Sequence, residues 1–496
     1  MKTMSEQALQ YRAISDSVTL FWEKPGEAGP GTLYTVLLDG VPAGETDRTH
    51  FTLEGVEPAV SHTVEVRRGD TVIGIVPVRT EQARRRLNVR DHGASGDGET
   101  MDTAAIQTVI DLCGAGEEVY FPAGVYRTGA LRLHSDMALC LDEGAVLQGT
   151  DLPEDYLPRI PSRFEGIEQE CYSSLLNLGW LDHAAGPNCE NVLIYGKGTI
   201  ASGGQPLAIA VIESERERLK EYLAANAELV ATCENDHTIP GRVRPRLINM
   251  SNCRNIRVTG LTLKNGASWN LHMIYSRDIV TDHCVFRSEG VWNGDGWDPD
   301  SSENCTLFAC EFYTGDDAVA IKSGKNPEGN VINRPTRHIR IFDCVSHFGH
   351  GIVIGSEMSG GVEDVRVWDC DLGQAMQGIE IKGTSKRGGY VRDFHVQDCT
   401  VARVLMHAVP YNNDGVPAPE QPVFEKCGFE RVRILGQSLD HDGVTTATPA
   451  IELCGFDAPG HEVRDISFRD CVLAEGHKGI RLQKCRGISF ENLCCE

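Results

Sequence analysis

The sequence predicts an all-β protein in which a small β-sandwich precedes a parallel β-helix, a solenoid built from stacked coils of short strands. Three observations predict this fold. The first 84 residues alternate apolar and polar residues between turn signals, and a strand-like unit then recurs every 26 to 34 residues. In addition, 41% of the 496 residues are hydrophobic, which is enough for a large core. We therefore expect two domains, residues 1–84 and 85–496.

The predicted sandwich rests on short strand-like runs. These runs are Val18–Trp22, Tyr34–Leu38, Phe51–Leu53 and His62–Val66. An Asp39-Gly40 turn signal follows the second run, and short strands between such turns are typical of a β-sandwich. The pattern resembles a fibronectin type III module, although His62 stands where that family usually has tyrosine. With no cluster of catalytic residue types here, we expect a spacer, packing or binding role.

The predicted solenoid rests on a repeated unit in which alternating apolar residues lead to Asp-Cys or a similar pair. The cysteines that end successive units are Cys284, Cys310, Cys344, Cys370, Cys399 and Cys427. Recurrence at this length with strand-like alternation indicates a β-rich solenoid. Equivalent residues of neighbouring coils would stack about 4.8 Å apart. We therefore expect an inward ladder of cysteines that act as small hydrophobic residues.

One segment has a helical rather than a strand-like pattern. Residues 212–233 place Leu219, Tyr222, Leu223 and Leu229 on one face at helical spacing. We expect an inserted helix that packs on the outside of the solenoid.

Charge and cysteine content limit the possible partners and the compartment. The formal net charge of −24 disfavours nucleic acid and anionic membranes, because both need a basic surface. No stretch approaches the roughly 20 apolar residues that span a bilayer. Eighteen cysteines and no apolar secretory run near residue 1 indicate reduced thiols and predict a cytoplasmic protein. The cysteine spacing fits no structural zinc site, so no metal or cofactor is expected, and an oligomer is compatible with the sequence.

The residues that could carry chemistry lie in four short motifs. They are Asn293-Gly294-Asp295, Gly315-Asp316-Asp317, Gly349-His350-Gly351 and Glu380-Ile381-Lys382. Their separations each fit one coil of the solenoid, so we expect them to share one face. Carboxyl groups held close together cannot all ionise cheaply, and an acid beside a carboxylate is what glycoside hydrolysis requires. A nearby imidazole and ammonium can balance the charge or hold an anionic sugar.

Each motif alone has a simpler explanation. The Asp-rich segment 295–300 could bind calcium, although it lacks the terminal glutamate of an EF-hand loop. Asp316 and Asp317 could merely cap a turn, and a single Gly-His-Gly could belong to the surface. Their order and their coil-length spacing favour a shared site.

Together the four motifs resemble those of glycoside hydrolase family 28, the polygalacturonase family, and the resemblance covers residues 87 to about 435. It implies a right-handed parallel β-helix and hydrolysis with inversion of α-linked galacturonic acid units in pectic oligosaccharides. Asp316 would then be the general acid, and Asp295 and Asp317 would hold and deprotonate the attacking water. His350 would orient the carboxylates, and Lys382 would contact a substrate carboxylate with Asn293 nearby.

The fourth motif departs from the family, because Glu380 stands at a substrate-binding position where arginine is usual. We expect Arg387, with Lys322 and Tyr390, to compensate at the substrate, so that restoring Arg at position 380 would raise activity. The neighbouring subsite could instead take a neutral sugar, as in rhamnogalacturonan or substituted galacturonan. The insertions and the cytosolic setting favour an exo-acting enzyme. A β-helical pectate lyase and a non-catalytic glycan-binding protein are the alternatives.

Overall fold

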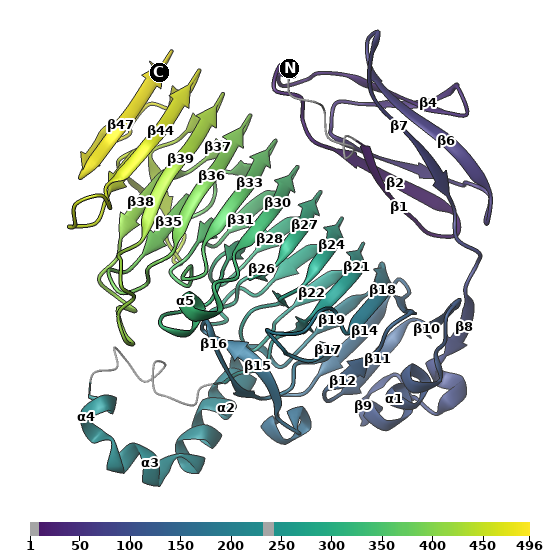
Figure 1. Cartoon of the computed structure of the whole chain (residues 1–496). Coiled ribbons are helices and arrows are strands. Elements are labelled where there is room, and N and C mark those ends of the chain that lie inside the picture. The colour runs from purple at the N-terminus through teal and green to yellow at the C-terminus, as the bar shows by residue number, and fades with distance from the viewer. Residues whose placement is uncertain (1–8, 232–242) are drawn as a thin grey trace. The chain divides into compact units, whose positions relative to one another are not determined.

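The computed structural model of the chain describes residues 9–231 and 243–496. It contains two compact units (Figure 1). The smaller unit comprises Met1–Arg86 and Gly114–Glu118, and the larger comprises Leu87–Cys113 and Val119–Glu496.

The smaller unit consists of two antiparallel sheets. One has the order β1-β2-β5, with β1 Leu9–Ala13, β2 Ser17–Trp22 and β5 His50–Glu54. The other has the order β4-β3-β6-β7, with β4 Val41–Thr46, β3 Tyr34–Leu38, β6 Ser61–Arg68 and β7 Thr71–Arg79. Alternate residues of β3 and β6, among them Val36, Val64 and Val66, are completely buried. Trp22 packs edge-on against Tyr34 at 5.2 Å between ring centroids. The prediction of a small all-β domain at the N-terminal side is therefore confirmed.

The larger unit is a parallel β-helix with three long sheets (Figure 1), as the sequence predicts. The first sheet has 13 strands: β8 Arg85–Asn88, β10 Glu117–Phe121, β13 Met137–Leu141, β18 Cys189–Gly196, β21 Cys253–Thr259, β24 Arg277–Asp282, β27 Glu303–Phe308, β30 Thr336–Phe342, β33 Val362–Trp368, β36 Tyr390–Gln397, β39 Val423–Glu430, β44 Val463–Arg469 and β47 Cys485–Glu491. The second also has 13: β9 Asp97–Met101, β11 Gly124–Thr128, β14 Ala145–Gly149, β19 Thr199–Ala201, β22 Thr262–Lys264, β25 Val285–Arg287, β28 Glu311–Tyr313, β31 Val345–Phe348, β34 Asp371–Leu372, β37 Thr400–Val401, β40 Arg433–Ile434, β45 Val472–Leu473 and β48 Cys494–Cys495. The third has 11: β12 Leu131–Leu133, β17 Leu176–Leu178, β20 Ile248–Ser251, β23 Leu271–Ile274, β26 Trp297–Asp300, β29 Val319–Ile321, β32 Gly351–Ile354, β35 Gly378–Gly383, β38 Arg403–Ala408, β43 Ile451–Cys454 and β46 Ile480–Gln483.

The remaining elements interrupt the coils or cover one end of them. Two hairpins project from the coils: β15 Ile160–Phe164 with β16 Ile167–Cys171, and β41 Gln437–Leu439 with β42 Thr445–Ala447. The short helices are η1 Val89–His92, η2 Pro153–Tyr156 and α5 Glu328–Ile332. Helix α1, Thr103–Leu112, buries Ile106, Val109 and Ile110 in the same core as the first strands. It therefore covers the start of the solenoid.

The turn before the cysteine explains why the repeat contains Asp-Cys pairs. Asp343, Asp369, Asp398 and Asp470 adopt left-handed backbone conformations with φ between 49° and 54°. Asp and Asn tolerate this region better than most residues, so a turn that requires it selects them. The cysteine that follows points into the core.

The ladder itself is confirmed for five cysteines and wrong for the sixth. The residue after each cysteine donates its N–H to the carbonyl of the cysteine one coil earlier, from Glu311 N to Cys284 O at 3.0 Å through to Thr400 N to Cys370 O at 3.0 Å. On the next coil Arg433 N bonds Cys399 O, which places Val432 in the ladder. Cys427 instead lies within β39, opposite Ile466 of β44. Spacing alone could not separate two inward positions that lie five residues apart on one coil.

The predicted helix over 212–233 is shifted and broken. Helix α2 spans Gly204–Arg218, α3 spans Lys220–Ala225 and α4 spans Ala227–Val230; Cys233 and the side chain of Leu229 lie outside the described residues. The buried face belongs to α2, with Leu207, Val211 and Ile212, whereas Tyr222 of the predicted apolar face is 48% exposed. Within the described ranges, no helix is both long and apolar enough to cross a membrane.

Candidate active site

The four motifs come together at consecutive strands of the 11-stranded sheet. The segments holding Asp295, Asp316-Asp317 and His350 directly precede β26, β29 and β32, and Lys382 lies in β35. These strands pair in that order. Gly296 N donates to Asp317 O and His350 N donates to Asp316 O, both at 3.0 Å. The expectation that winding places these groups on one face is therefore met.

The glycines of the third motif are required by its backbone. Gly349 and Gly351 have φ of 101° and 98°. A Cβ on Gly349 would lie 2.3 Å from Thr314 Oγ1, and one on Gly351 would lie 2.3 Å from Gly378 O. Only glycine combines this conformation with such close neighbours, and the result is that His350 is presented to the adjacent turn.

His350 joins the two adjacent carboxyl groups. Its Nδ1 lies 2.9 Å from Asp316 Oδ1 and 2.9 Å from Asp317 Oδ1. Burial opposes the charged imidazolium, but Asp316 and Asp317 outweigh it and raise the pKa of His350 well above its usual value. Burial likewise opposes ionisation of Asp316, yet His350 and then Lys382 lower the pKa of Asp316. These opposite shifts describe a single proton shared by the pair.

Asp295 is the most enclosed of the three predicted carboxyls. Lys322 Nζ donates to Asp295 Oδ2 at 3.2 Å, and Asp295 Oδ1 has no hydrogen-bond partner within the described part of the chain. Burial raises the pKa of Asp295 to about 8; Lys322 opposes this rise, and Asp316 and Asp317 add to it. This shift favours the protonated form of Asp295 at neutral pH.

Asn293 connects the site to a buried arginine that the sequence reasoning missed. Asn293 Nδ2 donates to Asp316 Oδ2 at 3.3 Å, and Asn293 Oδ1 accepts from Arg244 Nη2 at 2.6 Å. Burial lowers the pKa of Arg244 to about 10, against the opposing charges of Asp295 and Asp316. The sequence did contain a signal for this residue: Arg244 and Arg246 lie within an otherwise apolar run, which indicates buried charges.

Glu380, predicted at the substrate, instead contacts two side chains of the protein itself. It is 3% exposed and contacts His407 Nε2 at 2.7 Å and Lys382 Nζ at 3.5 Å. Burial opposes its charge, but Lys382 and His407 lower the pKa of Glu380 to about 2. The carboxylate thus holds Lys382, whose ammonium also interacts with Asp317 and Tyr411.

Arg387 and Tyr390 are corrections to the predicted site. Arg387 is 1% exposed and donates to Ser356 O, Asn326 Oδ1 and Asn412 O. Because its guanidinium is used to hold loops together, it is not available to bind a substrate carboxylate. Tyr390 starts β36 in a different sheet, where its hydroxyl donates to Glu363. Proximity in sequence to Lys382 suggested both, but the chain turns away after β35.

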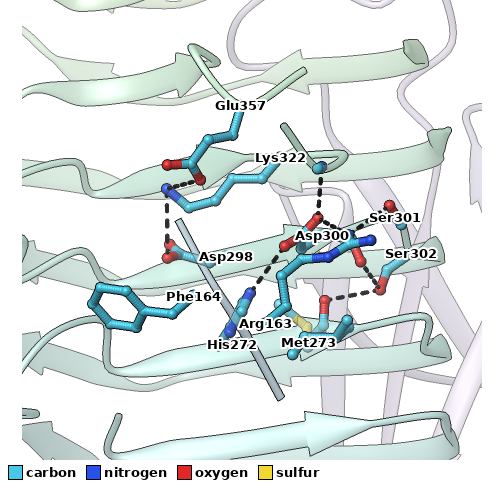
Figure 2. A network of polar contacts seen from close by, with 12 residues as sticks. Arg163, Phe164, His272, Met273, Asp298, Asp300, Ser301, Ser302, Lys322 and Glu357 are labelled. Carbon is cyan, nitrogen blue, oxygen red and sulfur yellow. Dashed lines mark hydrogen bonds and ion pairs between the residues drawn. The ribbon is translucent and has the colours of Figure 1, made fainter. Parts of the chain in front are cut away.

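Lys322 is also placed differently from the predicted substrate contact. It is 5% exposed, and its ammonium contacts the carboxyl groups of Asp298 and Glu357 (Figure 2). It also contacts the carboxyl group of Asp295. It therefore belongs to the interior of the site.

A second polar network anchors the β15–β16 hairpin beside the site (Figure 2). Arg163 Nη1 of the hairpin donates to Asp300 Oδ1 at 2.7 Å, and Asp300 Oδ2 lies 3.3 Å from His272 Nε2. Burial opposes the charge of Asp300, but Arg163 and His272 lower its pKa to about 2. In the segment 295–300, Asp295 and Asp298 therefore contact Lys322 and Asp300 contacts Arg163, so the three carboxyls do not converge on one calcium position.

Asp316, Asp317 and His350 also form a grouping that could hold a metal ion. Their ligand atoms lie within 4.8 Å of one another. A cation there would have to displace the proton that His350 Nδ1 shares with the two carboxylates, at 2.9 Å from each.

The chain matches family models over most of the solenoid. Residues 173–412 match the model described as glycosyl hydrolases family 28, and residues 86–140 match one described as rhamnogalacturonase A/epimerase, pectate lyase-like. The first match contains all four motifs.

Two curated relatives extend this similarity. The chain is 33% identical over 374 residues to a protein of Vitis vinifera named probable polygalacturonase, covering 71% of this chain and 69% of that protein. It is 30% identical over 400 residues to the exo-poly-alpha-D-galacturonosidase of Dickeya chrysanthemi, covering 77% of this chain and 66% of that protein. The chain thus spans about two thirds of the length of these relatives.

Solved structures agree on the fold. An exopolygalacturonase from Thermotoga maritima is 27% identical with a TM-score of 0.69, covering 83% of this chain and 92% of that one. A family 28 exopolygalacturonase from Yersinia enterocolitica has a TM-score of 0.76 at 22% identity, covering 98% of this chain and 96% of that one. The latter supports the architecture alone.

Proposed function

Because this chain belongs to family 28 of the glycosyl hydrolases, we propose that it is an exo-acting polygalacturonase that hydrolyses α-linked galacturonic acid units of pectic oligosaccharides with inversion. The observation that carries the proposal is the cluster of Asp295, Asp316, Asp317 and His350 on adjacent turns of one sheet. The relatives supply the substrate class, and the contacts within the cluster support a role for each group.

Asp316 is the proposed general acid. Its side chain is 25% exposed, whereas those of Asp317 and Asp295 are 5% and 3% exposed, so Asp316 is the carboxyl that a glycosidic oxygen can reach. The proton it needs is the one it shares with His350 across 2.9 Å. When substrate displaces water, the lower dielectric favours the neutral imidazole–carboxylic acid form of this pair, which readies Asp316 to protonate the leaving oxygen.

Asp295 and Asp317 are proposed to hold the attacking water. Asp295 Oδ2 is taken by Lys322, which leaves Oδ1 for the water. Asp295 is protonated at neutral pH, so we assign proton acceptance from the water to Asp317. Inversion follows if water attacks opposite the leaving group, without a covalent intermediate.

Lys382 is the proposed contact for a galacturonate carboxylate. Glu380 fixes its position, and Tyr411, which is 39% exposed, lies near enough to interact with its charge. Tyr411 offers a ring and a hydroxyl beside the ammonium, a combination suited to an anionic sugar.

The hairpin of β15 and β16 supports exo action. It crosses the outer face of earlier strands, with Ser162 bonded to Asn249 of β20 and Arg163 bonded to Asp300 of β26. Its tip reaches the segment after β29, where Lys325 N donates to Gly166 O and Glu168 N donates to Glu328 of α5 (Figure 1). A polysaccharide could not continue across these covered strands, so we infer that only a chain end enters.

We also infer that the smaller unit is a fibronectin type III-like module. Its support is the strand order, three strands in one sheet as β1-β2-β5 and four in the other as β4-β3-β6-β7. The cytoplasmic location remains a prediction, supported by the fact that every cysteine among the described residues is a free thiol.

Product analysis of purified oligogalacturonides tests the proposed function. We expect end units to be released from the first turnovers, with the new anomeric centre inverted by proton NMR and without the ultraviolet absorbance of an unsaturated product. An absorbing product would indicate a lyase, and tight binding without turnover would indicate a glycan-binding protein. Preference for rhamnogalacturonan would indicate a neutral-sugar subsite.

The Asp316→Asn variant tests the role of the acid. It keeps the shape of the side chain but cannot donate the proton, so we expect kcat to fall by about 10³-fold, within the range of general acid catalysis. Circular dichroism and the melting temperature serve as the folding control. Near-native activity in a folded variant would show that another group is the acid.

A further inference from the structure

The ammonium of Lys322 is buried among carboxyl groups of neighbouring coils (Figure 2). Lys322 directly follows β29, the strand that begins after Asp316 and Asp317. Its backbone pairs with Asp300, yet its Nζ lies 3.2 Å from Asp295 Oδ2 on the neighbouring coil. The side chain therefore links the coil of the acid to the coil of the water-holding carboxyl.

Three carboxyl groups surround this one ammonium. Besides Asp295, Asp298 Oδ2 lies at 3.9 Å and Glu357 Oε2 at 3.8 Å. The Lys322 Nζ also lies 4.7 Å from the centroid of the Trp269 ring, on the side of an earlier coil. Asp298 is completely buried, and neither of its carboxyl oxygens has a hydrogen-bond partner in residues 9–231 or 243–496. A buried ammonium is retained at such a place only if its neighbours compensate it.

We propose that Lys322 is a positioning residue for the reaction, which fixes the orientation and charge of Asp295, and that Glu357 in turn holds Lys322 in place. The inference rests on the proposed function, because it assigns Asp295 to the water. Lys322 donates to Asp295 Oδ2 and leaves Oδ1 without a partner among the residues that the structure describes. This bond fixes the orientation of the carboxyl group, and with it the direction of Oδ1. Glu357, which follows β32, supplies the anion that keeps the ammonium between the coils.

The charges around Asp295 determine which way each substitution acts. Groups that face or influence it are Arg244, Asp298, Asp316, Asp317, Lys322 and Glu357. The ammonium of Lys322 favours the ionised form of Asp295, so its removal must raise the pKa of Asp295 further above 8. Removing the charge of Glu357 leaves the ammonium less neutralised, which must shift the pKa of Asp295 downward.

Two variants are therefore expected to shift the pH–rate profile in opposite directions. For Lys322→Met we expect kcat on trigalacturonate to fall about 10²-fold with little change in KM, and the limb of the pH–rate profile that reports Asp295, near pH 8, to move up by about 1 to 3 units. For Glu357→Gln we expect the same limb to move to lower pH. Lys322→Arg, which retains a cation, should leave the limb close to its native position.

A second readout does not depend on turnover. Asp295 has a folded pKa above its unfolded value, so it favours folding at low pH, and this contribution is lost as pH rises from about 4 to about 8. One carboxyl can contribute a slope of at most one proton, so the variants should differ in the pH at which the decline in melting temperature ends. Compared with the native protein, we expect it to end at higher pH in Lys322→Met and at lower pH in Glu357→Gln.

The outcomes separate the two proposals. Opposite shifts support the positioning role. It would be overturned if the pH–rate limb and the pH at which the melting decline ends stay unchanged, or move in the same direction in both variants. If native protein does not hydrolyse oligogalacturonide, the proposed function fails, and the pH at which the melting decline ends still decides whether Lys322 controls the charge of Asp295. If Lys322→Met does not fold, Glu357→Gln and Lys322→Arg carry the comparison.

Discussion

At the scale of single residues, most charged groups of the site contact a group of opposite charge. His350 contacts two carboxylates and Lys322 contacts three carboxyl groups. Glu380 contacts both Lys382 and His407. Each charged group is buried or nearly so and is balanced by a partner from another coil. Exchanging one charge therefore affects its partners as much as the substrate.

Glu380 gives the clearest prediction of this kind. The sequence alone suggested that Glu380→Arg would raise activity by restoring an arginine clamp, but the structure reverses that expectation. An arginine would repel Lys382 and release His407, because both contact the carboxylate of Glu380. We expect kcat/KM on oligogalacturonide to fall by about 10- to 100-fold, the effect of a misplaced charge worth roughly 1.4 to 2.8 kcal/mol.

The neutral variant Glu380→Gln is the matched control. It keeps hydrogen bonding to His407 without introducing repulsion, so its loss should be smaller. Higher activity in Glu380→Arg than in native protein would restore the clamp hypothesis.

Sequence reasoning placed together the residues whose position depends on their own coil. Asp295, Asp316, Asp317, His350 and Lys382 were predictable because one coil length separates each motif from the next. Lys322 and Arg387 were misplaced, since their burial depends on segments brought in from other coils. No local pattern records such a contact, which explains why both were expected to face the substrate.

At the scale of elements, inserted segments distinguish this solenoid from a bare stack of coils. The β15–β16 hairpin leaves the coil after β14 and attaches through Arg163 to Asp300 and Tyr275. Arg163 is completely buried, so its ion pair with Asp300 is shielded from solvent. The hairpin is held by this pair and by the packing of Phe164 on Trp269, whose ring centroids are 5.0 Å apart.

The Arg163→Met variant tests whether the hairpin limits the enzyme to chain ends. It leaves Asp300 as a buried, partly compensated anion, which we expect to cost about 3 to 5 kcal/mol of unfolding free energy. A loosened hairpin should also admit longer substrates, so sized products should include internal fragments. Chemical denaturation and chromatography of the products measure the two effects.

The double variant Arg163→Met with Asp300→Asn provides the control. It removes both charges, and recovery of part of the stability would assign the loss to the unpaired anion. If the single variant is folded and still releases only end units, the hairpin does not determine exo action.

At the scale of the whole molecule, the two ends of the solenoid differ. At its start Ile106, Val109 and Ile110 of α1 are completely buried against the first coil. In the last coil β46, β47 and β48 each pair on one side only. There Ile480, Leu482 and Phe490 are 38% to 43% exposed. Strands with fewer buried contacts open more readily.

Hydrogen exchange should follow this gradient. We expect backbone amides of β46, β47 and β48 to exchange first and those of β26 and β29 last, because β26 and β29 are paired on both edges and all their residues are buried. Mass spectrometry of peptic fragments measures the order. Equal protection along all coils would show that the solenoid opens as one cooperative unit.

The position of the proposed reacting groups on consecutive turns has a consequence for how such an enzyme can diversify. Neighbouring parallel strands lie at a spacing that backbone hydrogen bonding dictates, so it hardly varies with side chains. Substitutions in the loops and the hairpin can therefore alter which saccharide fits, while the separation of acid and water site stays constant. The backbone therefore preserves the geometry that the reaction needs, while substitutions elsewhere can change the substrate preference.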